Sequence, residues 1–316
     1  MPIIPNSAIN GVITGWGRAL PETIVTNDDL AKTLDTSDEW IRERTGIEQR
    51  HIGGTTASLS IESGRRALEM SGVDPLSIDA LILATTTPDR TVPATSAAVQ
   101  NGLGLRCGAF DLNAACSGFV YGLVTAHGLI AIGMRNILVI GTDTLSRITD
   151  WTDRNTAILF ADGSGAAVIQ ATDGPGQLLG WDIDADGSLE DLLYADIGKT
   201  LYMEGKEVFR RAVRIMVDSA EKSLKAAGLT TSDITLVAPH QANIRIIEAA
   251  CKRLDIPMSK TSWVGDKTGN TSSASIPLAL FEAADNGRLK TGDNVLLVGF
   301  GAGMTAASAV IKWKQP

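Results

Sequence analysis

The chain repeats part of its own sequence, and this internal repeat constrains the fold more than any other feature. Residues 67–82 read ALEMSGVDPLSIDALI, and residues 223–238 read SLKAAGLTTSDITLVA. Three residues recur at an offset of 156: Leu68 as Leu224, Gly72 as Gly228 and Ile78 as Ile234. Each copy has the pattern of an amphipathic helix that ends at a glycine and is followed by a buried strand.

A second pair of segments repeats in the same order. Residues 135–141 (RNILVIG) match residues 293–299 (DNVLLVG) at an offset of 158. Two matches at nearly one offset favour a duplication over a chance likeness between helix–strand units. We therefore predict two similar halves, at 8–171 and 177–314, joined at the turn-forming residues 173–176 (DGPG).

Short apolar runs predict buried strands at 80–84, 137–140, 166–169, 236–238, 295–298 and 306–311. Because these runs show little period-2 alternation, we expect both faces of each strand to be covered. Helical patterns at 58–70 and 207–227 lie between the runs. The order of strands and helices predicts an α/β fold with mostly parallel or mixed sheets.

Charge and composition exclude several classes of protein. Lys and Arg total 28 against 36 Asp and Glu, and this net charge of -8 does not suit a general nucleic-acid binder. No apolar stretch is long enough to span a bilayer, and the first residues lack the pattern of a signal peptide. Three cysteines form no disulfide framework. We expect a protein of the reducing cytoplasm that contacts neither nucleic acid nor membrane.

Cys116 is the first candidate for chemistry. It follows a strand-like segment at 109–112 and two alanines, and it opens an apolar helical run. A thiol at a helix start is favoured as the thiolate by the helix dipole and the free N–H groups. Cys107 and Cys251 have no such context, and we expect both to be structural.

His240 and Asn270 complete a candidate set. His240 stands between a predicted strand and the helical run 244–254, at a strand end where ligands of α/β sheets gather. Asn270 starts another helical run 154 residues after Cys116, and we expect these two residues to hold corresponding positions whose helix starts face each other. Cysteine chemistry needs a nearby base or hydrogen-bond donor, which His240 and Asn270 would supply.

Two glycine-rich segments have the composition of ligand-binding loops. Residues 299–303 (GFGAG) follow a predicted strand, and their backbone N–H groups suit an oxyanion hole or a phosphate loop. Residues 15–20 lack the third glycine of a dinucleotide fingerprint. No Cys or His pair has zinc spacing, so we expect neither a metal nor a bound cofactor.

Five motifs together resemble the β-ketoacyl-acyl-carrier-protein synthase III family, the starter condensing enzymes of bacterial fatty-acid synthesis. They are TSDEWI (36–41), RTGI (44–47), NAACSGF (113–119), PHQAN (239–243) and GNTS (269–272). The resemblance spans about residues 13–313. It implies a thiolase-like fold of two similar halves with layers in the order αβαβα, and usually a homodimer. The implied reaction is decarboxylative condensation of an acyl-CoA with malonyl-acyl-carrier protein, which gives 3-ketoacyl-acyl-carrier protein.

The resemblance also implies a role for individual residues. Cys116 would take the acyl group from the acyl-CoA. His240 and Asn270 would stabilise the enolate that forms when the malonyl group loses carbon dioxide. The backbone N–H groups of Cys116 and Ala302 would form the oxyanion hole, and many members have Gly at the position of Ala302.

Substrate contacts are implied in the same way. Trp40 and Arg154 would sandwich the adenine of CoA, with Arg44 nearby and Asn243 along the pantetheine channel. The surface for the acyl carrier protein would comprise Arg210, Gln241, Arg245, Lys252 and Arg253. Val92 falls where the family lines the acyl pocket across the dimer, and some acetyl-preferring members have Phe there. The stretch 187–202 looks shorter than in many members, which leaves its contacts open.

Other activities stay open at this point. A relative on the same fold could only transfer acyl groups, or could condense starters for a secondary metabolite. A thiolase would have a second cysteine near residues 301–303, and a papain-like hydrolase would have a different signature around its cysteine. A non-catalytic partner subunit usually lacks the nucleophile, whereas Cys116 is present.

Overall fold

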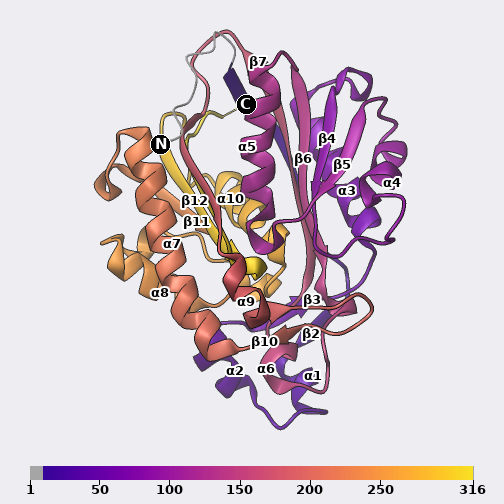
Figure 1. Cartoon of the computed structure of the whole chain (residues 1–316), viewed down its shortest axis with the longest axis vertical. Coiled ribbons are helices and arrows are strands. Elements are labelled where there is room, and N and C mark those ends of the chain that lie inside the picture. Colours follow the sequence, from indigo (N-terminus) through magenta and orange to yellow (C-terminus); the bar gives the residue numbers. More distant parts are fainter. Residues whose placement is uncertain (1–9, 316) are drawn as a thin grey trace.

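Two β-sheets form the centre of the computed structural model, which describes residues 10–315 (Figure 1). The start of the chain, where we expect no signal peptide, and residues 8 and 9 of the first predicted half lie outside the described residues. The first sheet contains β1 (Asn10–Ala19), β4 (Ala80–Ala84), β5 (Gly108–Leu112), β6 (Asn136–Thr144) and β7 (Asp162–Thr172), in the order β1-β7-β6-β4-β5. The second sheet contains β8 (Leu178–Ala185), β11 (Leu236–Pro239), β12 (Asn294–Gly301) and β13 (Thr305–Lys312), in the order β11-β12-β13-β8.

Helices cover both faces of each sheet and so complete five layers (Figure 1). Between the sheets lie α5 (Gly118–Ala131) and α10 (Ser275–Asp285), which follow the short turns η2 (Ala115–Ser117) and η7 (Ser272–Ala274). On the outer faces lie α3 (Thr56–Ser71) and α4 (Thr95–Gly102) at the first sheet, and α7 (Gly205–Ala227) and α8 (Ile244–Arg253) at the second. This is the αβαβα layering of a thiolase-like fold, as predicted.

Strand β4 explains why the apolar runs do not alternate. Ile82 packs in the layer between the two sheets, whereas Leu81 and Leu83 pack on the side of α3 and α4. All five residues of β4 are buried. Because both faces need apolar side chains, the sequence reads as a continuous run. The six predicted strands and the helices predicted at 58–70 and 207–227 are confirmed.

The repeated segments adopt the same structure in the two parts of the chain. Helix α3 ends at Gly72 (φ 66°) and α7 ends at Gly228 (φ 68°), in the left-handed conformation that glycine adopts without strain. Each glycine is followed by a 3-10 turn and then by a strand, through η1 (Pro75–Ser77) to β4 and through η5 (Thr231–Asp233) to β11. The chain passes from the first sheet to the second between Thr172, the end of β7, and Leu178, the start of β8. The assignment of 8–171 and 177–314 as domains stays a prediction.

The correspondence predicted between Cys116 and Asn270 is wrong by three residues. The turns η2 and η7 match at an offset of 157, which makes Asn113 the counterpart of Asn270. The Oδ1 atom of each asparagine accepts the backbone N–H two residues ahead, at 3.1 Å for Asn113 and 3.0 Å for Asn270. That second residue is left-handed in both, with φ 47° at Ala115 and 50° at Ser272. Both turns place an asparagine before the helix, so a helical run counted from Asn270 begins too early.

Shorter elements form the lower end of the molecule in Figure 1. They are α1 (Asn27–Ala31), α2 (Asp38–Thr45), α6 (Arg154–Ala157), β2 (Ile24–Thr26) and β3 (Gln49–His51), with α9 (Gly265–Thr268) nearby in the chain's second half. The remaining elements are η3 (Leu145–Arg147), η4 (Gly187–Leu192), β9 (Leu193–Tyr194), β10 (Tyr202–Met203), η6 (Met258–Lys260) and η8 (Ala302–Met304). Within residues 10–315, no helix is both long enough and apolar enough to cross a membrane.

Candidate functional site

Cys116 lies in the turn η2, directly before the buried helix α5. The backbone around it is tightly packed, because a Cβ atom added at Gly301 would lie 2.6 Å from the backbone nitrogen of Cys116. Ala302 follows Gly301 and is not left-handed, since Ala115, Asp255 and Ser272 are the non-glycine residues with positive φ in the described part of the chain. The strand end of β12 therefore reaches the backbone of Cys116, where the oxyanion hole is predicted.

Cys116 is a free cysteine that forms no disulfide within residues 10–315. Burial raises its pKa to about 12, and the charge of Asp143 acts in the same direction. The nearby Ser272 side chain partly opposes the rise in the pKa of Cys116. Burial and the charge of Asp143 thus disfavour the thiolate form of Cys116, which the helix start alone would favour. The thiol must therefore lose its proton during a reaction in which it is the nucleophile.

His240 follows β11 and is 1% exposed. Its backbone N–H donates to the Val298 carbonyl at 2.8 Å, and its ring Nδ1 lies 2.6 Å from the Ser275 hydroxyl. The ring of Phe300 packs edge-on against the imidazole, with 5.4 Å between the ring centres. Burial lowers the pKa of His240 to about 3, so the imidazole is neutral at physiological pH.

Asn270 is held by the backbone of the segment before β7. Its N–H donates to the Leu159 carbonyl and its carbonyl accepts from the Ala161 N–H, both at 2.9 Å. The side-chain Oδ1 accepts from the Ser272 N–H, and no hydrogen bond within residues 10–315 occupies Nδ2. The Asn270 amide therefore keeps an unused donor while its backbone is fixed.

Cys116, His240 and Asn270 line one small cavity of about 90 Å³, together with Phe300. A larger cavity of about 670 Å³ also reaches Cys116 and is lined by the loop 86–91 and by residues 193–198. Cys116 thus lies where two cavities meet.

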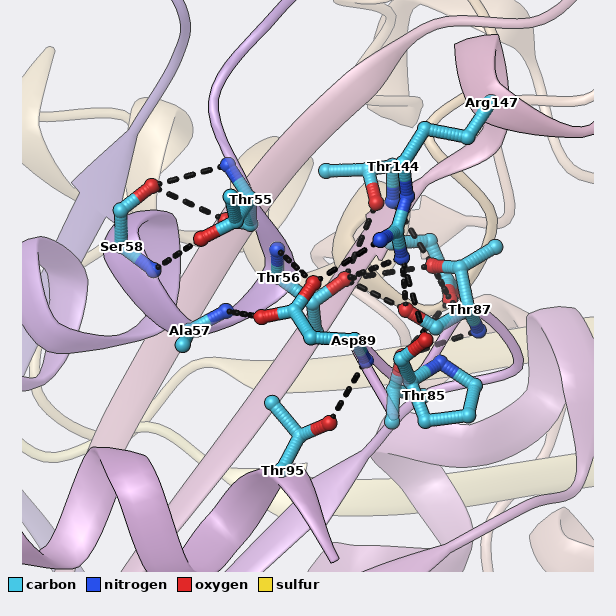
Figure 2. A network of polar contacts seen from close by, with 12 residues as sticks. Thr55, Thr56, Ala57, Ser58, Thr85, Thr87, Asp89, Thr95, Thr144 and Arg147 are labelled. Carbon is cyan, nitrogen blue, oxygen red and sulfur yellow. Dashed lines mark hydrogen bonds and ion pairs between the residues drawn. The ribbon is translucent and has the colours of Figure 1, made fainter. Parts of the chain in front are cut away.

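A polar network fixes one wall of the larger cavity (Figure 2). The Arg147 guanidinium donates to Asp89 Oδ1 at 3.0 Å and to the Thr87 carbonyl. The Asp89 carboxylate also accepts the N–H groups of Thr56 and Ala57, at 3.1 and 2.8 Å, and so caps α3. The loop that carries Thr87 and Asp89 is therefore tied to the start of a helix.

Asp143 joins the two parts of the chain behind Cys116. This carboxylate is fully buried, and its Oδ1 accepts from the Thr85 hydroxyl and from the N–H groups of Thr86 and Thr87. Its Oδ2 accepts from the N–H and the hydroxyl of Ser273, at 3.1 and 2.8 Å. These bonds stabilise a buried charge that would otherwise be costly.

The residues predicted to bind CoA lie together at an open cleft of about 940 Å³. Trp40, Arg44 and Asn243 line it, and the guanidinium groups of Arg44 and Arg154 stack on the Trp40 ring. Asn243 caps α8, because its Oδ1 accepts the Arg245 N–H at 2.9 Å. Leu159, Met203, Gly205, Phe209 and Asn243 line both this cleft and the 90 Å³ cavity. The cleft therefore leads toward Cys116.

The prediction that Gln241 contacts a carrier protein is wrong. Its side chain is fully buried, and the amide nitrogen donates to the carbonyls of Pro239 and Ser262 at 2.6 and 3.1 Å. Its oxygen accepts the N–H groups of Val264 and Gly265. Gln241 therefore positions the loop before α9 and presents nothing to a partner.

The other predicted carrier-protein residues are exposed on α7 and α8: Arg210, Arg245, Lys252 and Arg253. Arg210 forms an ion pair with Glu207 at 2.7 Å, and Arg245 also lines the 940 Å³ cleft. Val92 is 81% exposed and lies outside the lining of the 670 Å³ cavity in this subunit.

Three residues near the site lie outside the five motifs: Asp143, Ser273 and Ser275. Ser275 contacts the His240 ring, and Ser273 donates to Asp143, whose charge acts on Cys116. An alignment of the two repeats at an offset of 157 would have pointed to Ser272 and Ser273 as the counterparts of Ala115 and Cys116. Within residues 10–315, no group of three or more His, Cys, Asp or Glu side chains could hold a metal ion.

Comparisons with known proteins agree with this architecture. Family models described as 3-oxoacyl-[acyl-carrier-protein (ACP)] synthase III and its C terminal match residues 110–187 and 224–313. The β-ketoacyl-[acyl-carrier-protein] synthase III of Roseiflexus castenholzii is 50% identical, over 95% of this chain and 97% of its own.

Solved structures give the same family. The 3-oxoacyl-[acyl-carrier-protein] synthase III of Aquifex aeolicus has a TM-score of 0.94 and 42% identity, over 96% of this chain and 100% of its own. A priming β-ketosynthase from a polyketide biosynthetic pathway has a TM-score of 0.92 and 36% identity, over 97% of each chain. The chain belongs to the 3-oxoacyl-[acyl-carrier-protein] synthase III family, the starter condensing acyltransferases of fatty-acid synthesis.

Proposed function

We propose that the protein condenses a short or branched acyl-CoA with malonyl-acyl-carrier protein, with Cys116, His240 and Asn270 as the reacting set. The observation that supports this most strongly is the shared cavity, because it places a thiol, an imidazole and an amide with a free donor around one point. The cleft with Trp40 and Arg44 leads into that cavity and suits the nucleotide and arm of CoA.

In the first half-reaction, Cys116 Sγ forms a bond to the acyl carbon while the bond from that carbon to the CoA sulfur breaks. The proton of the thiol ends on the CoA sulfur. Backbone N–H groups of Cys116 and Ala302 stabilise the negative oxygen of the intermediate, and such preorganised donors are worth most in a dry site.

In the second half-reaction, the malonyl group loses carbon dioxide and leaves an enolate on its thioester. Donors from His240 and Asn270 stabilise the charge on the thioester oxygen. The enolate carbon forms a bond to the acyl carbon as the bond to Cys116 Sγ breaks, and one proton from solvent restores the thiol.

Two partners follow from this proposal. The exposed cations Arg245, Lys252 and Arg253 suit an acidic carrier protein and would guide it by charge, although the whole chain is acidic. A homodimer is supported by β5, an edge strand of the first sheet, and by exposed apolar residues that include Phe110 and Val92. We place the protein in the cytoplasm, and its reaction needs no cofactor beyond the two substrates.

The alternative function is starter condensation for a secondary metabolite. The likeness to a polyketide priming β-ketosynthase favours it as the second candidate. Both functions use the same chemistry at Cys116, so they differ in the starter and the pathway rather than in the reacting residues.

The test is intact-mass measurement after incubation with acetyl-CoA, followed by a panel of starters with malonyl-carrier protein. We expect an added acetyl group that disappears in Cys116→Ala but persists in Cys107→Ala and Cys251→Ala. The starter panel should give 3-ketoacyl products. An acyl label confined to Cys107 or Cys251 would overturn the assignment, and acyl transfer without any condensation product would show a transferase only.

A further inference from the structure

Within residues 10–315, the imidazole of His240 has one hydrogen-bond partner, the hydroxyl of Ser275 at 2.6 Å from Nδ1. Ser275 is the first residue of α10 and is fully buried, so no solvent competes for this contact. The same hydroxyl oxygen lies 2.7 Å from the Ser272 carbonyl oxygen. A hydroxyl has a single proton, so it donates to only one of these two acceptors.

The backbone decides which acceptor needs that proton. The Ser275 N–H already donates to the Ser272 carbonyl at the start of the helix. The Ser272 oxygen is thus satisfied without the hydroxyl, whereas the His240 Nδ1 has no other partner within residues 10–315. A buried polar atom left without a partner costs about 1–3 kcal/mol. The lower-energy arrangement sends the Ser275 proton to Nδ1.

The consequence falls on the other ring nitrogen. A neutral imidazole carries one proton, and burial keeps His240 neutral because it lowers the pKa of the ring. When Nδ1 accepts, the proton sits on Nε2. The ring lines the cavity that Cys116 and Asn270 share, and Nε2 is the nitrogen that Ser275 leaves free.

We propose that Ser275 is a positioning residue whose hydroxyl holds neutral His240 in the tautomer with its proton on Nε2. In this tautomer the ring is a donor toward the thioester oxygen of the malonyl substrate, beside the amide of Asn270. The opposite tautomer would present a lone pair there and repel the developing negative charge. The inference extends the proposed function, since the donor matters only if an enolate forms.

The test combines a spectroscopic reading with separate half-reactions. The chain has three histidines, so ¹⁵N-histidine labelling gives few ring signals, and His240→Gln assigns those of His240. In the wild type we expect the shifts of an Nε2–H ring. In Ser275→Ala we expect a mixture of tautomers, with release of labelled carbon dioxide from malonyl-carrier protein slowed about tenfold or more, since loss of a whole donor costs ~10²–10³ in rate. Acylation of Cys116, read by intact mass, should change little.

Two variants separate positioning from packing. Ser275→Thr keeps the hydroxyl and should restore the Nε2–H signal and most of the decarboxylation rate. Ser262→Ala removes another buried hydroxyl that donates to α10, at the Ala279 carbonyl, but lies outside the cavity lining. It should leave the His240 signals unchanged.

An Nδ1–H ring in the wild type overturns the proposal, and so does a Ser275→Ala variant with an unchanged tautomer and an unchanged rate of carbon dioxide release. The ring signals are read without substrates. If the wild type showed the Nε2–H ring but released no carbon dioxide, the proposed function would fail and the tautomer assignment would stand.

Discussion

The Arg154 guanidinium lies 4.8 Å from the centre of the Trp40 ring, and its Nη1 donates to the Asp35 carbonyl at 2.7 Å. A base between the two planes would need van der Waals contact on both sides, about 7 Å in all. Arg154 therefore stands where the adenine would lie in the proposed CoA complex. We predict that Arg154 swings away from the Trp40 ring when CoA binds and then closes on the other face of the adenine.

Replacement of Trp40 should weaken CoA substrates specifically. Stacking on an aromatic ring is worth about 1–3 kcal/mol per base, so Trp40→Ala should raise KM for acetyl-CoA roughly 5- to 150-fold with little change in kcat. Steady-state kinetics with acetyl-CoA checks this. Acetyl-N-acetylcysteamine, which lacks the nucleotide, is the control and should be used equally well by both proteins. An equal loss for both substrates would mean that Trp40 acts on the fold.

Asn270 should be needed for decarboxylation and not for acylation. Asn270→Asp keeps an oxygen for the Ser272 N–H but replaces the donor amide, so the turn survives and the donor is lost. We expect normal acetylation of Cys116, with carbon dioxide release about 10²–10³ slower, in this variant and in Asn270→Ala. Intact mass and labelled carbon dioxide report the two steps. Wild-type decarboxylation by Asn270→Asp, or failure of either variant to become acylated, contradicts this division of roles.

The buried His240 should make the protein sensitive to acid. The pKa of this ring is about 3 in the fold and about 6.5 when unfolded, so as pH falls the unfolded chain takes up a proton that the fold rejects. Stability from this group is therefore present above pH 6.5 and lost as pH falls toward 3. Between pH 7 and pH 5 the wild type should lose about 2 kcal/mol more than His240→Gln, measured by denaturant unfolding. Parallel losses in the two proteins would refute the prediction.

Val92, which the resemblance places in the acyl pocket of the second chain of the proposed homodimer, should leave that starter pocket wide. A small side chain replaces the Phe of some acetyl-preferring relatives, and each extra buried methylene gains about 0.8 kcal/mol. We expect kcat/KM to fall little from acetyl-CoA to four-carbon or branched five-carbon starters. Val92→Phe should reduce use of the longer starters about tenfold or more and spare acetyl-CoA. A wild-type drop beyond about a hundredfold between acetyl and four-carbon starters would count against a wide pocket, since it exceeds about 2.7 kcal/mol.

The cations of α8 should act mainly on encounter with the carrier protein. Lys252→Glu and Arg253→Glu should raise KM for malonyl-carrier protein several-fold at low salt, and the effect should shrink near 0.5 M salt because of screening. Arg210→Glu should have a smaller effect, since Arg210 already pairs with Glu207. Acetyl-CoA kinetics provides the control. A defect that is independent of salt would point to damaged folding.

The layered fold could be predicted because strands buried on both faces need continuous apolar sequence. Continuous apolar runs such as that of β4 require cover on both faces, and the glycines at 72 and 228 mark helix ends whose conformation other residues resist. The positions of Cys116 and His240 could be predicted for a similar reason, since both residues stand at the ends of such elements. Their roles in the reaction stay predictions.

What the sequence could not supply depends on contacts between distant residues. The resemblance places Gln241 on the carrier-protein surface, but three backbone groups distant in sequence satisfy its amide in the interior. The match of Asn113 to Asn270 was hidden because the offset changes along the repeat. The raised pKa of Cys116 could not be predicted because it arises first from burial by segments distant in sequence, and then from the charge of Asp143 on another strand, 27 residues later.

Three residues line both the 670 Å³ and the 90 Å³ cavity: Cys116, Phe160 and Leu193. The thiol can therefore be reached from either cavity. In the proposed reaction, a starter acyl group that lies in the 670 Å³ cavity leaves the 90 Å³ cavity free for the pantetheine arm of malonyl-carrier protein. A starter acyl group that lies in the 90 Å³ cavity would block the malonyl substrate. In the proposed reaction, the cavity that the starter enters therefore sets whether the second substrate can reach Cys116.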